Sequence, residues 1–318
     1  MMEKLLISNT PHVRGKATTR RIMIDVMIAL LPATVAGIVF FGWRAALTIV
    51  LALISAVASE VVFRLVKKES VKSIIKKYDF TSSVTGLLLG INLGSQSPWY
   101  TPILGSVFAI IVVKMLFGGT GKNFVNPAIC GRVFLVMSFG AAVGSGWLEP
   151  SIPAFLPTES GNLSLLDLLI GTGVAGSIGE TSKICLIIGG IYLVVRGVID
   201  WKYPTIYILV TGLTLSIFKL DFSLFLPSIL SGGLVLGAIF MATDYVTTPN
   251  TMTGNIVYFT ALGILTGIFR AVSGGEAVSY CILLMNFTVP LIDRFIVPKP
   301  FGYIKPEKPK AAKEGKNG

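Results

Sequence analysis

The sequence predicts an all-α, polytopic membrane protein with about ten transmembrane helices. Of its 318 residues, 53% are hydrophobic and only 14% are charged, whereas a soluble domain carries about 25% charged residues. The apolar residues gather in stretches that suit a bilayer, which a helix of about 20 residues crosses. The charges behind the net +11 lie at the chain ends and in one loop, which is typical of membrane-span flanks and not of a nucleic-acid surface. This composition excludes disorder, a disulfide scaffold and an ordinary cytosolic enzyme.

The first half of the chain holds a polar tail and five candidate spans. Residues 1–21 are polar and basic, and no small-residue cleavage site follows the first apolar run, so the tail is not interpreted as a signal peptide. The candidate spans lie at about 22–42, 45–66, 81–94, 102–118 and 127–143. Residues 22–143 are therefore interpreted as a first five-helix repeat.

A long loop and five more candidate spans follow. The loop, residues 144–182, contains no Lys or Arg but several acidic residues, prolines and glycines. Long loops in compact bundles are usually functional, and a short helix is expected over 163–170. The later candidate spans lie at about 183–199, 203–219, 224–243, 255–272 and 276–296. Residues 183–296 then form a second five-helix repeat, and 297–318 form a basic tail.

The positions of Lys and Arg predict that both termini face the cytoplasm. In this orientation 21 Lys and Arg residues lie in cytoplasmic segments. Only four lie on the external side: Arg44, Lys183, Lys219 and Arg270. Positively charged loops stay on the cytoplasmic side of a membrane. The loop 144–182 is therefore expected to be external.

Short motifs recur between the two halves at offsets near 150 residues. Gly86-Leu-Leu-Leu-Gly90 is similar to Gly233-Leu-Val-Leu-Gly237, and other pairs keep the same order. With five spans in each half, the second repeat must insert upside down. Inverted repeats place sites at the midplane between broken helices, and the third and eighth spans are the expected breaks. The alternative is chance similarity between Gly- and Leu-rich helices.

Three ionisable residues within the predicted spans are candidates for an ion path: Lys114, Asp25 and Glu60. Charged groups in a bilayer are costly and are functional candidates. Alternatively, Lys114 extends to the interface, and the two acids lie at the cytoplasmic boundary. Arg132, near a helix start, is suited to hold a loop or a phosphate. No metal site is predicted, because the three cysteines stand alone and the single histidine lies in the polar tail.

Two segments on the predicted cytoplasmic side are too polar for plain spans. Residues 118–127 offer backbone N–H groups, Asn123, Asn126 and a proline placed to start a helix. Such a helix start suits an anionic or carbonyl-rich ligand. Residues 241–249 end an apolar helix with Asp244 and three threonines. The two segments are either capped turns or, since they converge on one face, parts of one polar pocket.

Several motifs in one order carry a resemblance to a known family. They are Asp79-Phe-Thr-Ser-Ser-Val-Thr-Gly-Leu-Leu-Leu-Gly90, Pro98-Trp99, Lys114, Gly118-Gly119, Asn123-Phe-Val-Asn-Pro-Ala128, Gly176-Ser-Ile-Gly-Glu-Thr-Ser182, Phe240-Met-Ala-Thr-Asp244 and Leu283-Leu-Met-Asn-Phe-Thr-Val-Pro-Leu-Ile-Asp293. Together they resemble the RnfD and NqrB family of membrane proteins. The resemblance covers nearly the whole chain, and the short N-terminal tail favours the Rnf branch.

The resemblance implies an inner-membrane protein built, like urea transporters, from two inverted five-helix halves. It implies a six-subunit Rnf translocase, with RnfA, RnfB, RnfC, RnfE and RnfG as partners, that passes electrons from ferredoxin to NAD and moves Na⁺ or H⁺. It also implies riboflavin on the cytoplasmic side, near Asn123, Asn126 and Asp244, and FMN joined through its phosphate to an external threonine. An electron arriving on a flavin places negative charge in an apolar pocket, which attracts a cation.

The external loop departs from the family pattern for FMN. The family has Ser-Gly-Ala-Thr followed by Pro-Leu, whereas this loop reads Thr158-Glu-Ser-Gly-Asn-Leu-Ser-Leu-Leu-Asp167. Aligning the Ser-Gly pairs puts Leu163 at the threonine position, and leucine has no oxygen for a phosphoester. If the loop is instead shortened, Thr158 is the local candidate for covalent FMN. FMN is therefore covalent at Thr158, noncovalent or absent.

Two other functions are compatible with the sequence. One is a small-solute channel or transporter of urea-transporter-like fold, and the other is a non-redox membrane anchor within the complex. A flavin absorption band in the purified protein would distinguish the flavin-carrying Rnf subunit from both of these alternatives.

Overall fold

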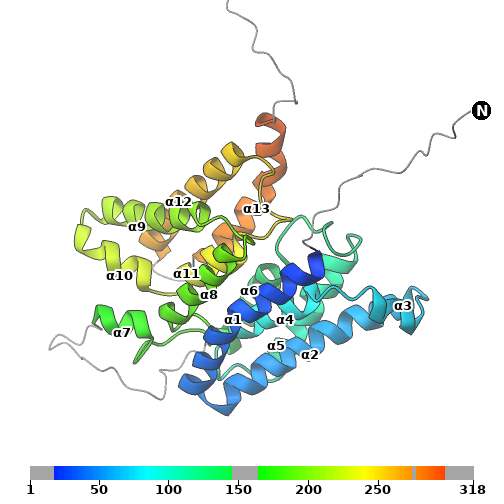
Figure 1. Cartoon of the computed structure of the whole chain (residues 1–318). Helices are drawn as coiled ribbons and strands as arrows, with labels where there is room; N and C mark the ends of the chain where they lie inside the picture. The colour runs from blue at the N-terminus through cyan, green and yellow to red at the C-terminus, as the bar shows by residue number, and fades with distance from the viewer. Residues whose placement is uncertain (1–17, 145–163, 274–276, 298–318) are drawn as a thin grey trace, which may run out of the picture.

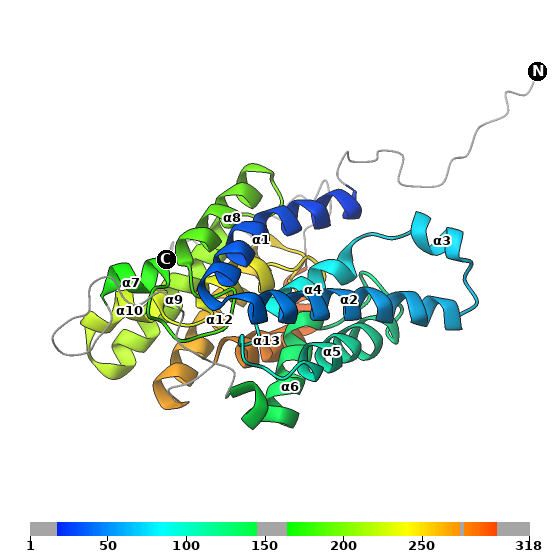
Figure 2. The same ribbon diagram turned by 90° about the horizontal axis from the view of Figure 1, so that it is seen from below.

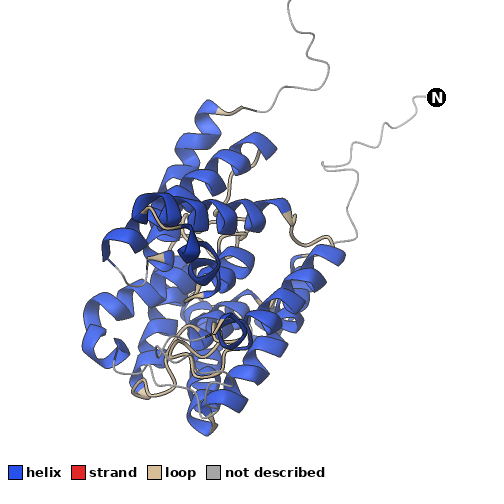
Figure 3. Ribbon diagram, turned by 90° about the vertical axis from the view of Figure 1, so that its left-hand side faces the viewer, coloured by secondary structure: helices blue, strands red, loops and turns tan. Residues whose placement is uncertain are grey.

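The computed structural model describes residues 18–144, 164–273 and 277–297. Within these ranges the regular elements are all helical, and no strand is present (Figure 3). The predicted all-α class is therefore confirmed for the described part of the chain.

The first half of the chain forms seven helical elements. They are α1 (Thr19–Phe41), α2 (Trp43–Val66), α3 (Val71–Lys76), α4 (Thr81–Ile91), α5 (Tyr100–Val107), the π-helix η1 (Phe108–Met115) and α6 (Pro127–Gly144). Each of the five apolar stretches predicted there is largely helical.

The second half forms the remaining elements. They are α7 (Leu165–Ile170), α8 (Lys183–Val195), α9 (Lys202–Lys219), η2 (Phe222–Leu224), α10 (Phe225–Leu230), α11 (Leu234–Leu236), the π-helix η3 (Gly237–Met241), α12 (Met252–Ser273) and α13 (Val278–Phe295). The short helix expected over 163–170 is α7. The expected break in the eighth stretch is also present, since Phe222–Leu230 and Leu234–Met241 are bent by 66°.

The helices identify a multi-pass membrane protein. Among the described residues four helices, α1, α2, α12 and α13, are long and apolar enough to cross a bilayer, and the bent pair makes a fifth. Large apolar side chains of α1 and α2 point outward, with Val35 57%, Val39 61% and Ile54 58% exposed. Such side chains need lipid rather than water around them.

The two halves of the chain lie side by side. In Figure 1 the first-half helices, α1 to α6, occupy the lower right, and the second-half helices α9, α10, α12 and α13 occupy the upper left. Figure 2 shows α8 beside α1 from below, and α13 next to α6 of the first half. At that contact a Cβ atom on Gly189 of α8 would overlap the carbonyl oxygen of Ala29 on α1. The join between the halves therefore depends on two backbones in close approach.

Glycines on α4 also allow this helix to pack closely against α2 in the centre of the first half. A Cβ on Gly86 would lie 2.8 Å from the Ala52 carbonyl oxygen, and one on Gly90 would lie 3.0 Å from the Ile49 Cα of α2. Small residues four positions apart allow membrane helices to pack at this distance. As a consequence, residues 82–95, which comprise most of α4 and the turn that follows it, are all buried.

The ends of α4 and η3 meet at the centre of the molecule. The Asn92 side-chain nitrogen, just after α4, lies 3.7 Å from the Met241 sulfur at the end of η3. Asn126 Nδ2, just before α6, donates to the Met241 carbonyl oxygen at 3.1 Å. These short helices form part of the wall between two cavities, which contain the candidate site.

Candidate functional site

Cavity A has a volume of about 390 Å³ and gathers residues from both polar segments predicted from the sequence. Its walls are mainly apolar and come from α1, α4, α8 and η3. Its polar lining includes Asn123, Asn126, Asp244 and Lys114, which come from three separate parts of the chain. The two polar segments therefore do form one pocket, as one of the two sequence interpretations predicted.

Asn126 connects the two polar segments. Its Oδ1 accepts from the N–H of Ala128 at 3.0 Å and of Ile129 at 3.4 Å, so it caps the first turn of α6. Pro127 is the first helical residue, as predicted. Both the oxygen and the nitrogen of the Asn126 side-chain amide are therefore hydrogen-bonded to backbone groups, of α6 and of Met241. Asn126 thus fixes the positions of the two segments that line cavity A.

Asn123 and Asp244 complete the polar end of cavity A. Asn123 Nδ2 donates to the Val125 carbonyl oxygen at 3.0 Å, which leaves its amide oxygen as an acceptor. Asp244 lies in the turn after η3, where the Thr247 hydroxyl donates to Oδ2 at 3.3 Å. Burial raises the pKa of the Asp244 carboxyl, although hydrogen bonds from Val246 and Thr247 oppose the rise. Asp244 therefore places a buried carboxyl at the polar end of cavity A.

A buried ion pair joins Lys114, in the lining of cavity A, to Glu60 outside it. Lys114 Nζ lies 2.9 Å from Glu60 Oε2 of α2 and donates to the Thr81 hydroxyl at 2.5 Å. Glu60 Oε1 lies 2.6 Å from Arg64 Nη2, without good hydrogen-bond alignment. Lys114 is only 2% exposed, so it does not reach the surface as the alternative interpretation proposed.

The network continues to Asp79, in the turn before α4. Its Oδ1 accepts from the Thr81 hydroxyl at 2.6 Å and its Oδ2 from the Thr120 hydroxyl at 2.8 Å. Burial alone would raise the pKa of the Asp79 carboxyl, but these hydrogen bonds and the Lys114 charge outweigh it and hold the pKa below the ordinary 3.8.

Asp79 is therefore expected to stabilise the fold only when ionised. Because its pKa is lower in the folded state, the contribution is complete above pH 3.8 and is lost as the pH falls through the lowered value. Thermal unfolding of the wild type and Asp79→Asn, measured against pH in detergent, should differ by a constant amount at neutral pH and converge on acidification. A difference that stays constant throughout the acid range would contradict this account.

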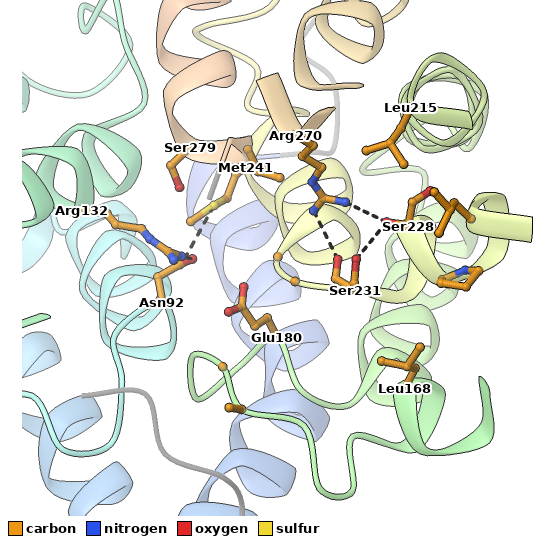
Figure 4. Close-up of a pocket in the computed structure, with 17 residues that line it drawn as sticks. Asn92, Arg132, Leu168, Glu180, Leu215, Ser228, Ser231, Met241, Arg270 and Ser279 are labelled. Carbon is orange, nitrogen blue, oxygen red and sulfur yellow. Dashed lines mark hydrogen bonds between the residues drawn. The ribbon is translucent and has the colours of Figure 1, made fainter. Parts of the chain in front are cut away.

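Cavity B, of about 460 Å³, lies on the other side of the α4–η3 contact (Figure 4). Its charged residues are Arg132, Arg270 and Glu180. Arg132 Nη1 donates to the Asn92 side-chain oxygen. Arg270 donates to the carbonyl oxygens of Ser228 at 2.7 Å and Ser231 at 3.2 Å, at the break after α10.

Glu180 is the acidic group of cavity B. Its Oε1 accepts from the Ser177 N–H at 2.8 Å. Its Oε2 is buried, lies against Gly233 and has no hydrogen-bond partner among the described residues. Figure 4 shows the carboxylate pointing towards the space between Arg132 and Arg270. A ligand carrying both donor groups and negative charge would match this set of side chains.

Several predicted residues lie elsewhere, and some cavity residues were missed. Asp25 pairs with Arg196, directly after α8, with Arg196 Nη2 3.1 Å from Oδ1. It therefore links the halves instead of lining either cavity. Thr158 lies outside the described residues. Thr81 and Glu180 stood in quoted motifs without a role, and Arg270 was counted only as a loop charge. Its place at the end of an apolar span was the available signal.

Cavity A has the features of a small-molecule site. It is concave and mostly apolar, with a few convergent polar groups that would fix the orientation of a ligand. A flat ring with carbonyl and N–H groups at one edge would match these walls.

The fold and the two cavities define a multi-pass membrane protein with internal sites between its helices. Residues 6–302 match the NQR2, RnfD, RnfE family, so the chain belongs to this family, as its motifs indicated.

Curated relatives of full length support this membership. The chain is 43% identical to the D subunit of the Na⁺-translocating ferredoxin:NAD⁺ oxidoreductase complex of Acetobacterium woodii, over 96% of this chain and 97% of that protein. It is 36% identical to the proton-translocating counterpart of Clostridium ljungdahlii, over 93% and 96%. It is 31% identical to the D subunit of the ion-translocating oxidoreductase complex of Salmonella typhimurium, over 94% and 99%.

Proposed function

We propose that this chain is the D subunit of an Rnf-type translocase, which couples electron transfer between ferredoxin and NAD to movement of Na⁺ or H⁺. Family membership and relatives named for this activity at up to 43% identity support the assignment. The chain acts within a multi-subunit complex, with RnfA, RnfB, RnfC, RnfE and RnfG as its partners, and has no complete activity alone.

Ten spans in two inverted halves, with both termini cytoplasmic in a prokaryotic inner membrane, are the topology proposed here. The Lys and Arg distribution supports the orientation. The two short central helices support the repeat, since a left-handed residue precedes each of them. Phe80, with φ 64°, comes directly before α4, and Gly232, with φ 60°, precedes the cap of α11. Cavity A then opens towards the cytoplasmic side and cavity B towards the external side.

Riboflavin is the ligand proposed for cavity A. The single observation that carries this assignment is the convergence of Asn123, Asn126 and Asp244 on one apolar-walled cavity. Val84, Leu88 and Phe240 would pack on the faces of the isoalloxazine ring. Asn123 and Asp244 would hold its carbonyl and N–H edge, and Asn126 would keep the two polar segments in place around it. A flavin accepts one or two electrons, and this protein would bind it, orient it and exclude water.

FMN is proposed for the external side. Cavity B is lined by Leu168, Gly176 and Glu180, which belong to the same predicted loop, 144–182, as Thr158. The guanidinium groups of Arg132 and Arg270 are the side chains suited to a phosphate or a ring carbonyl. We propose FMN either joined covalently through Thr158 or bound noncovalently.

Flavin extraction tests the proposed function. Acid precipitation of the purified complex should release riboflavin, whereas FMN linked to Thr158 would stay with the protein. Asp244→Ala should weaken riboflavin binding about tenfold or more, because one hydrogen bond to a charged or strongly polar group is lost. Asp200→Ala, at a more exposed aspartate of the same end, should retain full riboflavin content. A colourless complex, or an unchanged riboflavin content in Asp244→Ala, would favour a solute channel or an anchor instead.

A further inference from the structure

The position of Lys114, buried and yet in the lining of cavity A, is not explained by its ion pair alone. Lys114 belongs to η1, is 2% exposed and contributes to the lining of cavity A. The pair with Glu60 lies deep enough that well-packed apolar residues would serve stability equally well. A buried ammonium in a membrane protein is therefore a candidate for a role in the cavity.

The hydrogen bonds of Lys114 leave one donor available. An ammonium carries three N–H groups. Among the described residues, two of them have partners, the Glu60 carboxylate on α2 and the Thr81 hydroxyl at the start of α4. Glu60 lies outside cavity A, whereas Thr81 and Lys114 both line it, so a ligand in the cavity can reach the third N–H.

The third N–H of Lys114 belongs to one of the few charged groups around cavity A. Lys114 and Asp244 are the charged residues that line it within the described part of the chain. Glu60 and Arg64 of α2 face Lys114 from behind, and Asp79 faces it through Thr81. Lys114 is therefore the positive charge that this lining presents to a ligand, alongside the Asp244 carboxyl.

We propose that Lys114 donates its third N–H to an electron-rich atom of the ligand in cavity A and thereby raises the reduction potential of that ligand. The inference rests on the proposed riboflavin site. A charge-assisted hydrogen bond strengthens as its acceptor gains negative charge, and a fixed donor in a dry cavity needs no reorganisation. Glu60 competes with the ligand for the ammonium and so tunes its effect.

Redox titration of the purified complex tests this role. The riboflavin signal is first identified as the one diminished in Asp244→Ala. E60Q should then make its potential less negative than in wild type, because Lys114 loses a competing carboxylate. E60Q/K114M should lower the equilibrium constant for the first electron about tenfold relative to E60Q, which is about 59 mV. The double variant avoids leaving a buried carboxylate beside an apolar side chain. Lys202→Met, at an exposed lysine, is the matched control and should change nothing.

The outcomes separate the two proposals. Absence of riboflavin from the wild-type complex would refute the cavity A assignment itself. Riboflavin present in both E60Q and E60Q/K114M, with the same potential, would overturn the role of Lys114 alone. Selective loss of riboflavin from E60Q/K114M, with unfolding temperature unchanged from E60Q, would support direct contact.

Discussion

Replacing Glu60 by leucine is expected to lower the free energy of unfolding by about 3–5 kcal/mol, the cost of leaving a buried charge without its partner. Glu60 is fully buried and is the shared carboxylate for Lys114, at 2.9 Å, and Arg64, at 2.6 Å. Without it, two cations would face an apolar side chain. The measurement is thermal or denaturant unfolding of the complex in detergent, and the signal is the release of this chain from the complex.

The double variant E60L/K114M provides the control for this prediction. It removes both members of the deeply buried pair, and Arg64, which is partly exposed, can turn towards solvent. Most of the lost stability should therefore return, so the two substitutions should be strongly non-additive. Additive losses would show that Glu60 and Lys114 act independently.

Replacing Gly189 by leucine should separate the two halves of the molecule. A Cβ at this position would overlap the Ala29 carbonyl oxygen, and the ring of Phe240 lies 3.0 Å away, so α1, α8 and η3 would all have to shift. Overpacking typically costs about 1–3 kcal/mol, and a clash with backbone belongs at the upper end. The unfolding temperature should fall, and cavity A, which these helices line, should lose its ligand.

Gly140→Leu is the matched control for Gly189→Leu. Gly140 lies within α6, and a Cβ there would meet no atom within 4 Å. This substitution should leave the unfolding temperature almost unchanged. An equal fall in both variants would indicate that the close approach of α1 and α8 is not what holds the halves together.

Much of the fold was predictable because its signals are local. Each apolar stretch identified by hydropathy is largely helical, since the period and length of apolar residues decide which segments can be buried or face lipid. Asn126 followed by Pro127 also carries its own signal for a helix start. The sequence could thus place Asn123, Asn126 and Asp244 at one end of the molecule by orientation alone.

The chain alone therefore determined the all-α class, the helical stretches, a break in the eighth stretch and the polar character of the two cavity A segments. Only the tertiary structure decided which charges meet. Glu60 and Lys114 are 54 residues apart, and Asp25 and Arg196 are 171 apart. It also brought Glu180 beside Arg132 and Arg270. Such pairings depend on how glycine faces let helices approach, and a hydropathy pattern, which records each residue separately, carries no information about distance between helices.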